Sequence, residues 1–165
     1  MPSAGSKPPV LVTGAAGFIG MHVCRRLIAR GEAVIGIDNL NAYYDPQLKR
    51  DRIAQLRPLA DFDFEQADIV EPGRIANIIA DHGVRRVIHL AAQAGVRHSL
   101  RDPLAYIQAN IVGFANVLEA CRHAAIEHLV YASSSSVYGS NNKVPFSEDD
   151  RTDEPASLYA ATKKS

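Results

Sequence analysis

Cysteine is scarce in this chain of 165 residues: only Cys24 and Cys121 occur, and neither has a partner at metal-ligand spacing. This usage favours two reduced, buried thiols in a cytoplasmic protein over a disulfide scaffold. The histidines show no metal spacing either, so we expect no metal site. Eighteen basic and eighteen acidic residues cancel, so no net charge attracts nucleic acid or an anionic membrane. No apolar run is long enough for a membrane span, and residues 1–9 lack the apolar core of a secretory signal.

Helical patterns separate the short apolar runs that predict strands, at 10–12, 33–37, 62–66, 86–90 and 128–132. This alternation predicts an α/β fold, a Rossmann-type doubly wound parallel sheet. We expect one such domain over 10–165, preceded by a flexible lead-in over 1–9. Such sheets bind ligands at the carboxyl ends of their strands.

A long helix is predicted from Pro103, because proline suits the first turn of a helix. Asn110 lies in this helix and is expected to face the small residues at 91–95. Helical spacing predicts one apolar face, made of Leu104, Ile107, Ile111, Phe114, Leu118 and Cys121.

The stretch VLVTGAAGFIG, residues 10–20, predicts a strand, a glycine turn and the start of a helix. That geometry directs a helix N-terminus at a pyrophosphate. Gly14 permits the tight turn, Gly17 lets phosphate oxygens approach, and Gly20 lets the helix pack on its strand. The spacing is GxxGxxG, whereas the standard fingerprint is GxGxxG. The candidate cofactor contacts of this turn are Gly14, Gly17, Phe18, Ile19 and Gly20.

Acidic residues end the next two predicted strands. Asp38 lies eighteen positions after the last glycine of the turn, where a carboxylate accepts hydrogen bonds from an adenosine ribose. Its charge would repel a 2′-phosphate, which favours NAD over NADP; the alternative is an aspartate that caps a loop. Asp68 either accepts from the adenine amino group or N-caps the next helix, which residues 71–72 are expected to open. The candidate contacts of the adenosine half are Asp38, Asn39, Asp68 and Ile69.

Small residues, AAQAG at 91–95, follow the fourth predicted strand and would let a flat cofactor lie against the backbone. His89 precedes them and is interpreted as a histidine satisfied within the core. The candidate cofactor contacts in this loop, in the long helix and after the fifth strand are Leu90, Ala91, Ala92, Gln93, Asn110 and Ser133.

Tyr159 and Lys163 are four positions apart in YAATK, so on a helix they share one face. An isolated tyrosine titrates near pH ~10, and a neighbouring ammonium favours its phenolate, which suits a base for a sugar or alcohol hydroxyl. Four serines, 133–136, follow a predicted core strand and offer a hydroxyl for the same substrate oxygen. The alternative for Tyr159 and Lys163 is that they are two exposed helix residues without a catalytic role. The alternative for the four serines is that they form an ordinary loop.

These segments together resemble the extended short-chain dehydrogenase/reductase family, of the NAD-dependent epimerase/dehydratase type. TGAAGFIG, Asp38-Asn39, HLAAQAGVR, YASSSSVYG and YAATK match in order over nearly the whole chain. More narrowly, DNLNAYYDPQLK, HLAAQAGVRHSL and PFSEDD resemble UDP-glucuronate 4-epimerases. His98 stands where a tyrosine is expected.

The resemblance implies NAD as cofactor and a nucleotide sugar as substrate. The pyrophosphate of NAD would lie on the three glycines. The adenosine ribose of NAD would contact Asp38, and its adenine would lie beside Asp68 and Ile69. Tyr159 would be the general base, and Lys163 would also bind the nicotinamide ribose. Ser134 would be the catalytic hydroxyl, and Ser135 and Ser136 would contact the sugar. Related dehydratases carry Asp-Glu where Ser135-Ser136 stand, which argues against water elimination.

The implied reaction interconverts UDP-glucuronate and UDP-galacturonate through a transient 4-keto sugar, with NAD regenerated in each cycle. The alternatives are another extended short-chain reductase or decarboxylase of nucleotide sugars, or an NAD-binding module without turnover. Family members continue beyond YxxxK into a small substrate domain. We therefore expect a fragment or truncated product of impaired activity, in which the family's homodimer is also in doubt.

Overall fold

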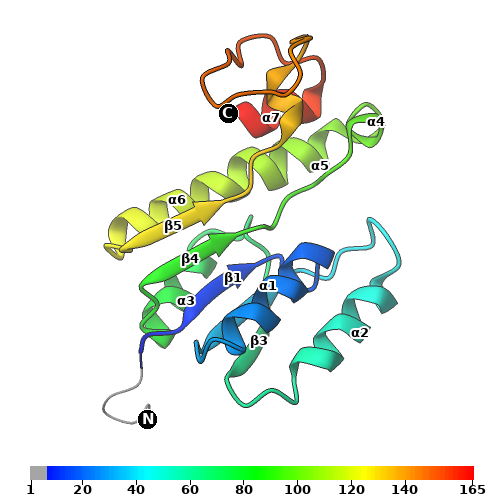
Figure 1. Ribbon diagram of the computed structural model, residues 1–165. Coiled ribbons are helices and arrows are strands. Elements are labelled where there is room, and N and C mark those ends of the chain that lie inside the picture. Colours follow the sequence, from blue (N-terminus) through cyan, green and yellow to red (C-terminus); the bar gives the residue numbers. More distant parts are fainter. Residues whose placement is uncertain (1–6) are drawn as a thin grey trace.

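A computed structural model describes residues 7–165 and shows a five-stranded parallel sheet in the order β3-β2-β1-β4-β5 (Figure 1). Residues 1–6 of the expected lead-in lie outside the described residues. The predicted α/β doubly wound fold is confirmed, and each predicted strand is present. The strands are β1 (Val10–Thr13), β2 (Val34–Asp38), β3 (Phe62–Gln66), β4 (Arg86–His89) and β5 (His128–Tyr131).

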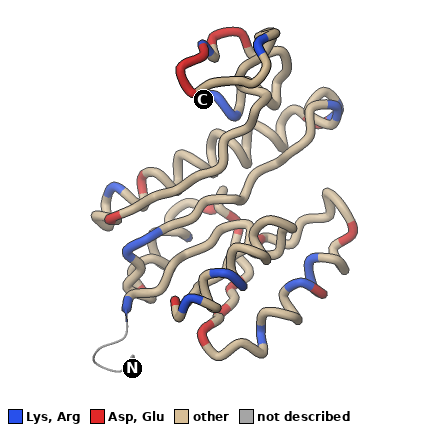
Figure 2. Tube along the Cα trace, viewed as in Figure 1, with Lys and Arg blue, Asp and Glu red and all other residues tan. Residues whose placement is uncertain are grey.

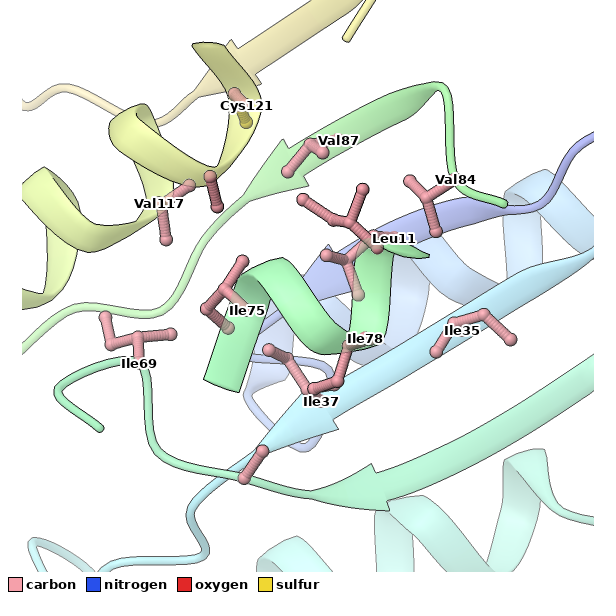
Figure 3. Close-up of a cluster of buried hydrophobic side chains, with 13 residues drawn as sticks. Leu11, Ile35, Ile37, Ile69, Ile75, Ile78, Val84, Val87, Val117 and Cys121 are labelled. Carbon is pink, nitrogen blue, oxygen red and sulfur yellow. The ribbon is translucent and has the colours of Figure 1, made fainter. Parts of the chain in front are cut away.

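Helices cover both faces of this sheet, because alternate side chains of each central strand point to opposite sides. In β1, Val10 and Val12 join one apolar cluster while Leu11 joins the other. The first cluster includes residues of α1 (Phe18–Ile28) and α2 (Pro46–Leu56). The second includes residues of α3 (Arg74–His82) and α6 (Phe114–His123), with Ile75, Ile78 and Val117 among them (Figure 3).

Local sequence signals set the helix ends. Asp45 N-caps α2 by accepting from the Gln47 N–H at 2.9 Å, and Pro46 occupies the first helical position, where proline is favoured. Gly83, with φ of 62°, ends α3. The predicted start of α3 at residues 71–72 is wrong by two residues, because these lie in a turn and Gly73 is the N-cap.

The long helix from Pro103 is not uniform. It consists of α5 (Pro103–Ile107), a π-helical segment η1 (Gln108–Gly113) and α6. The predicted apolar face is wrong in part: Leu104 is 68% exposed and Ile111 and Leu118 are also exposed, whereas Cys121 is buried and Phe114 packs against the core. The buried stripe lies one position earlier, at Tyr106, Asn110, Gly113, Val117 and Ala120.

Two small or polar residues explain this shift. A Cβ on Gly113 would lie 2.7 Å from Ile69 Cδ1, so glycine lets the helix approach that side chain without displacing it. Asn110 is buried because backbone groups satisfy its amide. A prediction based on the spacing of apolar residues cannot detect either contact.

By length and composition alone, the helical stretch Pro103–His123 would suffice to cross a membrane, contrary to the sequence expectation. Its inner side packs Val117, Ala120 and Cys121 into the apolar cluster that contains Leu11, on one face of the sheet. The core helix of a globular domain passes the same composition test. Among the described residues no other helix does so.

Strand β5 forms one edge of the sheet, and Val130 and Tyr131 are exposed on it. The prediction of a core strand at 128–132 is therefore wrong about burial, although the strand itself is present. Beyond β5 the chain forms a short 3₁₀ turn, η2 (Ser135–Tyr138), a long polar loop and α7 (Leu158–Lys164). Figure 2 shows acidic and basic residues interspersed over most of the chain, with an acidic stretch in that loop.

Candidate cofactor and active site

A cleft of about 360 Å³ opens at the carboxyl ends of the strands. Its walls come from the glycine turn, the ends of β2 and β3, and the loop after β4. Most predicted cofactor residues line it: Gly14, Gly17, Phe18, Ile19, Gly20, Asp38, Asn39, Asp68, Ile69, Leu90, Ala91, Ala92 and Gln93. Four predicted cofactor residues lie outside its lining, Asn110, Ser133, Tyr159 and Lys163, and so do the predicted substrate contacts Ser134, Ser135 and Ser136.

The glycine turn presents free backbone donors to this cleft. Gly14 has φ of 71°, in the left-handed region, and a Cβ on Gly20 would lie 2.0 Å from Gly14 O. Gly17 N-caps α1 without a side-chain hydrogen bond, and the first turn of α1 holds no acidic residue. The first N–H groups of α1 therefore keep their donors for an anion, with the helix dipole in its favour.

Asp38 ends β2 with its carboxylate directed at the cleft. Its Oδ1 accepts from the Leu40 N–H at 2.8 Å and from Lys49 Nζ at 3.4 Å. The aspartate thus caps its own loop, as the alternative interpretation held, while lining the cleft as the cofactor hypothesis requires.

Asp68 ties the ends of two strands together. Its Oδ2 accepts from Asn39 Nδ2 at 2.9 Å, and its Oδ1 accepts from the Val70 N–H at 3.0 Å. It does not N-cap α3, whose N-cap is Gly73, so that alternative is wrong. The contact to adenine stays a prediction.

Thr13 and His89 fix the loop after β4. The Thr13 hydroxyl accepts from the Leu90 and Ala91 N–H groups at 3.1 and 3.0 Å, so its single proton is left for His89 Nδ1 at 2.8 Å. His89 is buried and stacks on Phe114, with ring centroids 5.1 Å apart. Burial, with the nearby charge of Lys163, lowers the pKa of His89 to about 4. His89 is a satisfied core histidine, as predicted.

Asn110 joins this loop to α7. Its Oδ1 accepts from the Gln93 N–H at 2.8 Å, and its Nδ2 donates to Gln93 O at 2.9 Å and to Thr162 Oγ1 at 3.0 Å. Asn110 therefore faces the small-residue loop, as expected. Both donor protons of its amide are used within the protein, which makes it a positioning residue.

Two tyrosines converge on the same carbonyl. The hydroxyls of Tyr43 and Tyr106 donate to Ala94 O at 2.8 and 2.6 Å. Tyr43 belongs to residues 40–45, a segment that we call the strap, so its bond joins the wall after β2 to the wall after β4. Burial raises the pKa of Tyr106 to about 12, which keeps its proton in place as a donor. The His98 ring meets Tyr43 edge to face at 4.9 Å.

Helix α7 brings Lys163 to the edge of the cleft. Ser157 N-caps α7 by accepting from the Ala160 N–H at 3.0 Å, and α7 packs on η2, the turn that carries the serines. Lys163 Nζ donates at 2.5 Å to the carbonyl of Ala132, which lines the cleft. Burial lowers the pKa of Lys163.

The serine run is only partly free. Ser134 Oγ accepts from the Ser136 N–H at 3.2 Å and from Ser136 Oγ at 2.8 Å, so it N-caps η2. The Ser134 hydroxyl proton remains for another acceptor. The Tyr159 ring packs edge to face on Tyr106 at 6.0 Å.

This arrangement matches a known family. A family model described as NAD dependent epimerase/dehydratase covers residues 10–165. The chain belongs to the NAD-dependent epimerase/dehydratase family. NAD, the cofactor expected from Asp38 and the glycine turn, is the one that defines this family.

Individual relatives agree with this assignment. UDP-glucuronate 4-epimerase 3 of Arabidopsis thaliana is 54% identical over 156 residues, which cover 94% of this chain and 36% of that protein. A crystal structure of the Bacillus cereus UDP-glucuronic acid 4-epimerase with UDP-glucuronic acid and NAD matches with a TM-score of 0.85 and 37% identity, over 94% of this chain and 49% of the other. The Thermus thermophilus UDP-glucose 4-epimerase in complex with NAD gives a TM-score of 0.80 and 35% identity, over 94% and 47%. The chain thus spans half or less of the length of these relatives.

Sequence reasoning missed one wall of the cleft, made of Asn41, Tyr43, Tyr44 and Lys49. The sequence over 41–58 suggests an insertion with a mostly polar helix, and polar residues on such a helix normally face solvent. The available signal was position: this segment follows Asp38 directly, at the edge of the sheet where the ligand binds.

Proposed function

We propose that this chain provides the cofactor-binding and proton-transfer half of an NAD-dependent nucleotide-sugar 4-epimerase that interconverts UDP-glucuronate and UDP-galacturonate. One observation carries the proposal: Lys163, on the helix of Tyr159, bonds to Ala132, and Ala132 lines the same cleft as Gly14 and Asp38. This contact supports a position of the Tyr159 helix beside the cofactor cleft.

The residues of the cleft fit NAD. The first turn of α1 offers unpaired N–H donors for the pyrophosphate, and the glycines keep Cβ atoms out of its path. Asp38 accepts from the adenosine ribose, and Asp68 and Ile69 flank the adenine. Alanines 91 and 92 leave a flat surface for the nicotinamide half. Bound there, NAD would supply a reversible hydride acceptor for C4 of the sugar.

The proton is transferred to a side chain of α7. Tyr159, as its phenolate, takes the proton of the sugar 4-hydroxyl as the hydride leaves and becomes a neutral phenol. The ammonium of Lys163 stabilises the phenolate before this transfer. The carbonyl of Ala132 holds Lys163 in position. The Ser134 hydroxyl donates to the substrate oxygen, while its own oxygen is held by Ser136.

Hydroxyls at Ser135 and Ser136 suit the sugar of a uronate substrate, and no acid–base pair for water elimination occupies those positions. Relatives named UDP-glucuronate 4-epimerase support this substrate over other nucleotide sugars. The runner-up is a reductase or decarboxylase of the same family. The buried free thiols Cys24 and Cys121 suit a reducing cytoplasm.

We further propose that the 165 residues alone bind NAD but turn over poorly, as an NAD-binding module would. The support is the coverage of relatives, 36% of the Arabidopsis protein and 49% of the Bacillus protein. Substrate contacts supplied by the remaining half of such relatives would be needed for full activity.

The test titrates NAD into the chain by calorimetry and assays conversion of UDP-glucuronate by chromatography. A chimera that continues from Ser165 into the corresponding half of the Arabidopsis relative is the active comparison, and its Tyr159→Phe variant is the control. We expect NAD binding by both proteins, and conversion only by the chimera with Tyr159. Absence of NAD binding would refute the cofactor assignment, and rapid conversion by the 165-residue chain would refute its impairment.

A further inference from the structure

A threonine on the helix of Tyr159 is buried, although the proposed reaction gives it no role. Thr162 is 3% exposed and lies on α7 directly before Lys163. Its hydroxyl accepts from Asn110 Nδ2 at 3.0 Å and donates to Tyr159 O at 2.9 Å. A buried hydroxyl is costly unless hydrogen bonds replace those it made to water. Both bonds of Thr162 are made to protein groups, so its proton is not available to a ligand.

Helix α7 depends on contacts with the rest of the protein, because it has only seven residues. Isolated helices shorter than about 12 residues are marginal in water. Within residues 7–165, two side-chain hydrogen bonds join α7 to other segments: Thr162 to Asn110, and Lys163 to Ala132. Since the ammonium of Lys163 must also stabilise the phenolate, Thr162 is the anchor that takes no part in proton transfer.

This anchor leads to the wall of the cleft on which the cofactor would lie. Asn110 holds the backbone of Gln93 through two further hydrogen bonds, at 2.8 and 2.9 Å. Gln93 directly follows Ala91 and Ala92, and all three line the cleft. One amide and one hydroxyl therefore link the backbone of this wall to the backbone of Tyr159.

The group that Thr162 binds on α7 belongs to both proton-transfer residues. In an α-helix the carbonyl of residue 159 accepts from the N–H of residue 163. By donating to this carbonyl, the Thr162 hydroxyl fixes the helical turn that carries Tyr159 and Lys163. A shift of that carbonyl would move both side chains relative to the cofactor wall.

We propose that Thr162 is a positioning residue for proton transfer, whose hydroxyl, through Asn110, sets the distance between Tyr159 and the cofactor wall. The inference rests on the proposed function. Transfer requires reacting atoms about 3–3.5 Å apart, and a misplacement of about 1 Å can cost about 100-fold in rate. Because both hydrogen bonds of Thr162 are internal, its loss should slow the reaction with little effect on the binding of cofactor or substrate.

A purely structural role predicts a different pattern. In that role Thr162 would matter through the stability of α7, and every substitution that destabilises the helix would reduce activity in proportion. Two substitutions separate the roles, because serine keeps the hydroxyl and loses the methyl group, whereas valine keeps the branched shape and loses the hydroxyl. Only the positioning role distinguishes a serine variant from a valine variant by their rates and not by their stabilities.

The test uses the active chimera with the Arabidopsis half and its Thr162→Val and Thr162→Ser variants. Thr152→Val is the matched control, since Thr152 is a half-buried threonine in the loop before α7. Chromatography gives kcat and KM for UDP-glucuronate, calorimetry gives the Kd of NAD, and urea denaturation gives stability. A readout without turnover is carbon NMR of the 165-residue chain with its six tyrosines labelled at the phenol carbon, in which Tyr159→Phe assigns the Tyr159 signal.

We expect Thr162→Val to lower kcat about tenfold, to leave KM and the Kd of NAD within about twofold of wild type, and to shift the Tyr159 signal. Thr162→Ser should keep the wild-type kcat and signal, and Thr152→Val should match wild type throughout. The inference is overturned if Thr162→Val keeps the wild-type kcat or signal, if it weakens NAD by the same factor, or if Thr162→Ser loses as much activity. A wild-type chimera that converts no UDP-glucuronate would instead overturn the proposed function.

Discussion

The side-chain amide of Asn110 closes a pair of hydrogen bonds with the backbone of Gln93, at 2.8 Å from the N–H and 2.9 Å to the carbonyl. This pair holds the loop that forms one wall of the cleft. Because the same amide reaches Thr162, the cofactor wall and the catalytic helix α7 share one anchor.

Asn110→Asp should therefore destabilise the protein strongly. It replaces the Nδ2 donor by a carboxylate oxygen that faces Gln93 O, and Thr162 cannot compensate because its hydroxyl proton already goes to Tyr159 O. A buried, unpaired acceptor should lower the free energy of unfolding by about 2–4 kcal/mol. Urea denaturation measures this, with the exposed Asn142→Asp as control. Equal stability of the two variants would contradict the anchor.

Tyr43→Phe should speed the release of NAD with little effect on folding. The change removes one cross-cleft hydrogen bond, from the strap to Ala94 O, and leaves the ring on His98. A loss of about 1 kcal/mol corresponds to about fivefold faster dissociation. Stopped-flow displacement of NADH measures this rate. Tyr131→Phe on the exposed edge strand is the control, and equal rates in both variants would argue against the strap as a closure.

The order of elements and most of the cleft could be predicted from sequence, because both depend on short-range patterns. Glycine spacing, apolar runs and a carboxylate at a strand end are local, and they identified Gly14, Gly20 and Asp38. The sequence alone could not predict which face of the long helix is buried. The buried stripe includes Asn110 and Gly113, and their partners Gln93 and Ile69 are distant from them in the sequence.

The wall of the cleft that contains Lys49 could not be predicted for the same reason, because it depends on contacts between segments distant in the sequence. Nothing near Lys49 in the sequence marks it as buried, since it lies on a polar helix among exposed neighbours. Its environment arises only in the folded protein, where Nζ meets Asp38 at the end of β2 and Asn41. The exposure of β5 was likewise beyond a local pattern, because an apolar run does not say whether its strand is central or at an edge.

His89 should make folding stability depend on pH. Its pKa falls from 6.5 to about 4 in the folded protein, so the unfolded chain binds its proton first as pH drops. Stability from the neutral ring is complete above pH 6.5 and is lost between pH 6.5 and 4, by about 3 kcal/mol. Urea denaturation across this range should show a shallower slope for His89→Asn. The exposed His128→Asn should keep the wild-type slope, and a shared slope in all three proteins would refute the assignment.

Two alanine substitutions in the glycine turn should separate packing from ligand approach. A Cβ on Gly20 would lie 2.0 Å from Gly14 O, between parts of the backbone that cannot move apart without displacing α1. Gly20→Ala should therefore lower the free energy of unfolding by about 3 kcal/mol. A Cβ on Gly17 would lie 3.0 Å from the same oxygen, at a φ of −71° that any residue adopts.

Gly17→Ala should accordingly fold with a loss below about 1 kcal/mol, yet bind NAD about tenfold more weakly, because its methyl group enters the path of the pyrophosphate. Urea denaturation and calorimetric NAD titration of both variants measure the two effects. A Gly17→Ala protein that binds NAD like the wild type would place the pyrophosphate elsewhere than on the first turn of α1. A Gly20→Ala protein of wild-type stability would mean that α1 can move away from the turn without loss of packing.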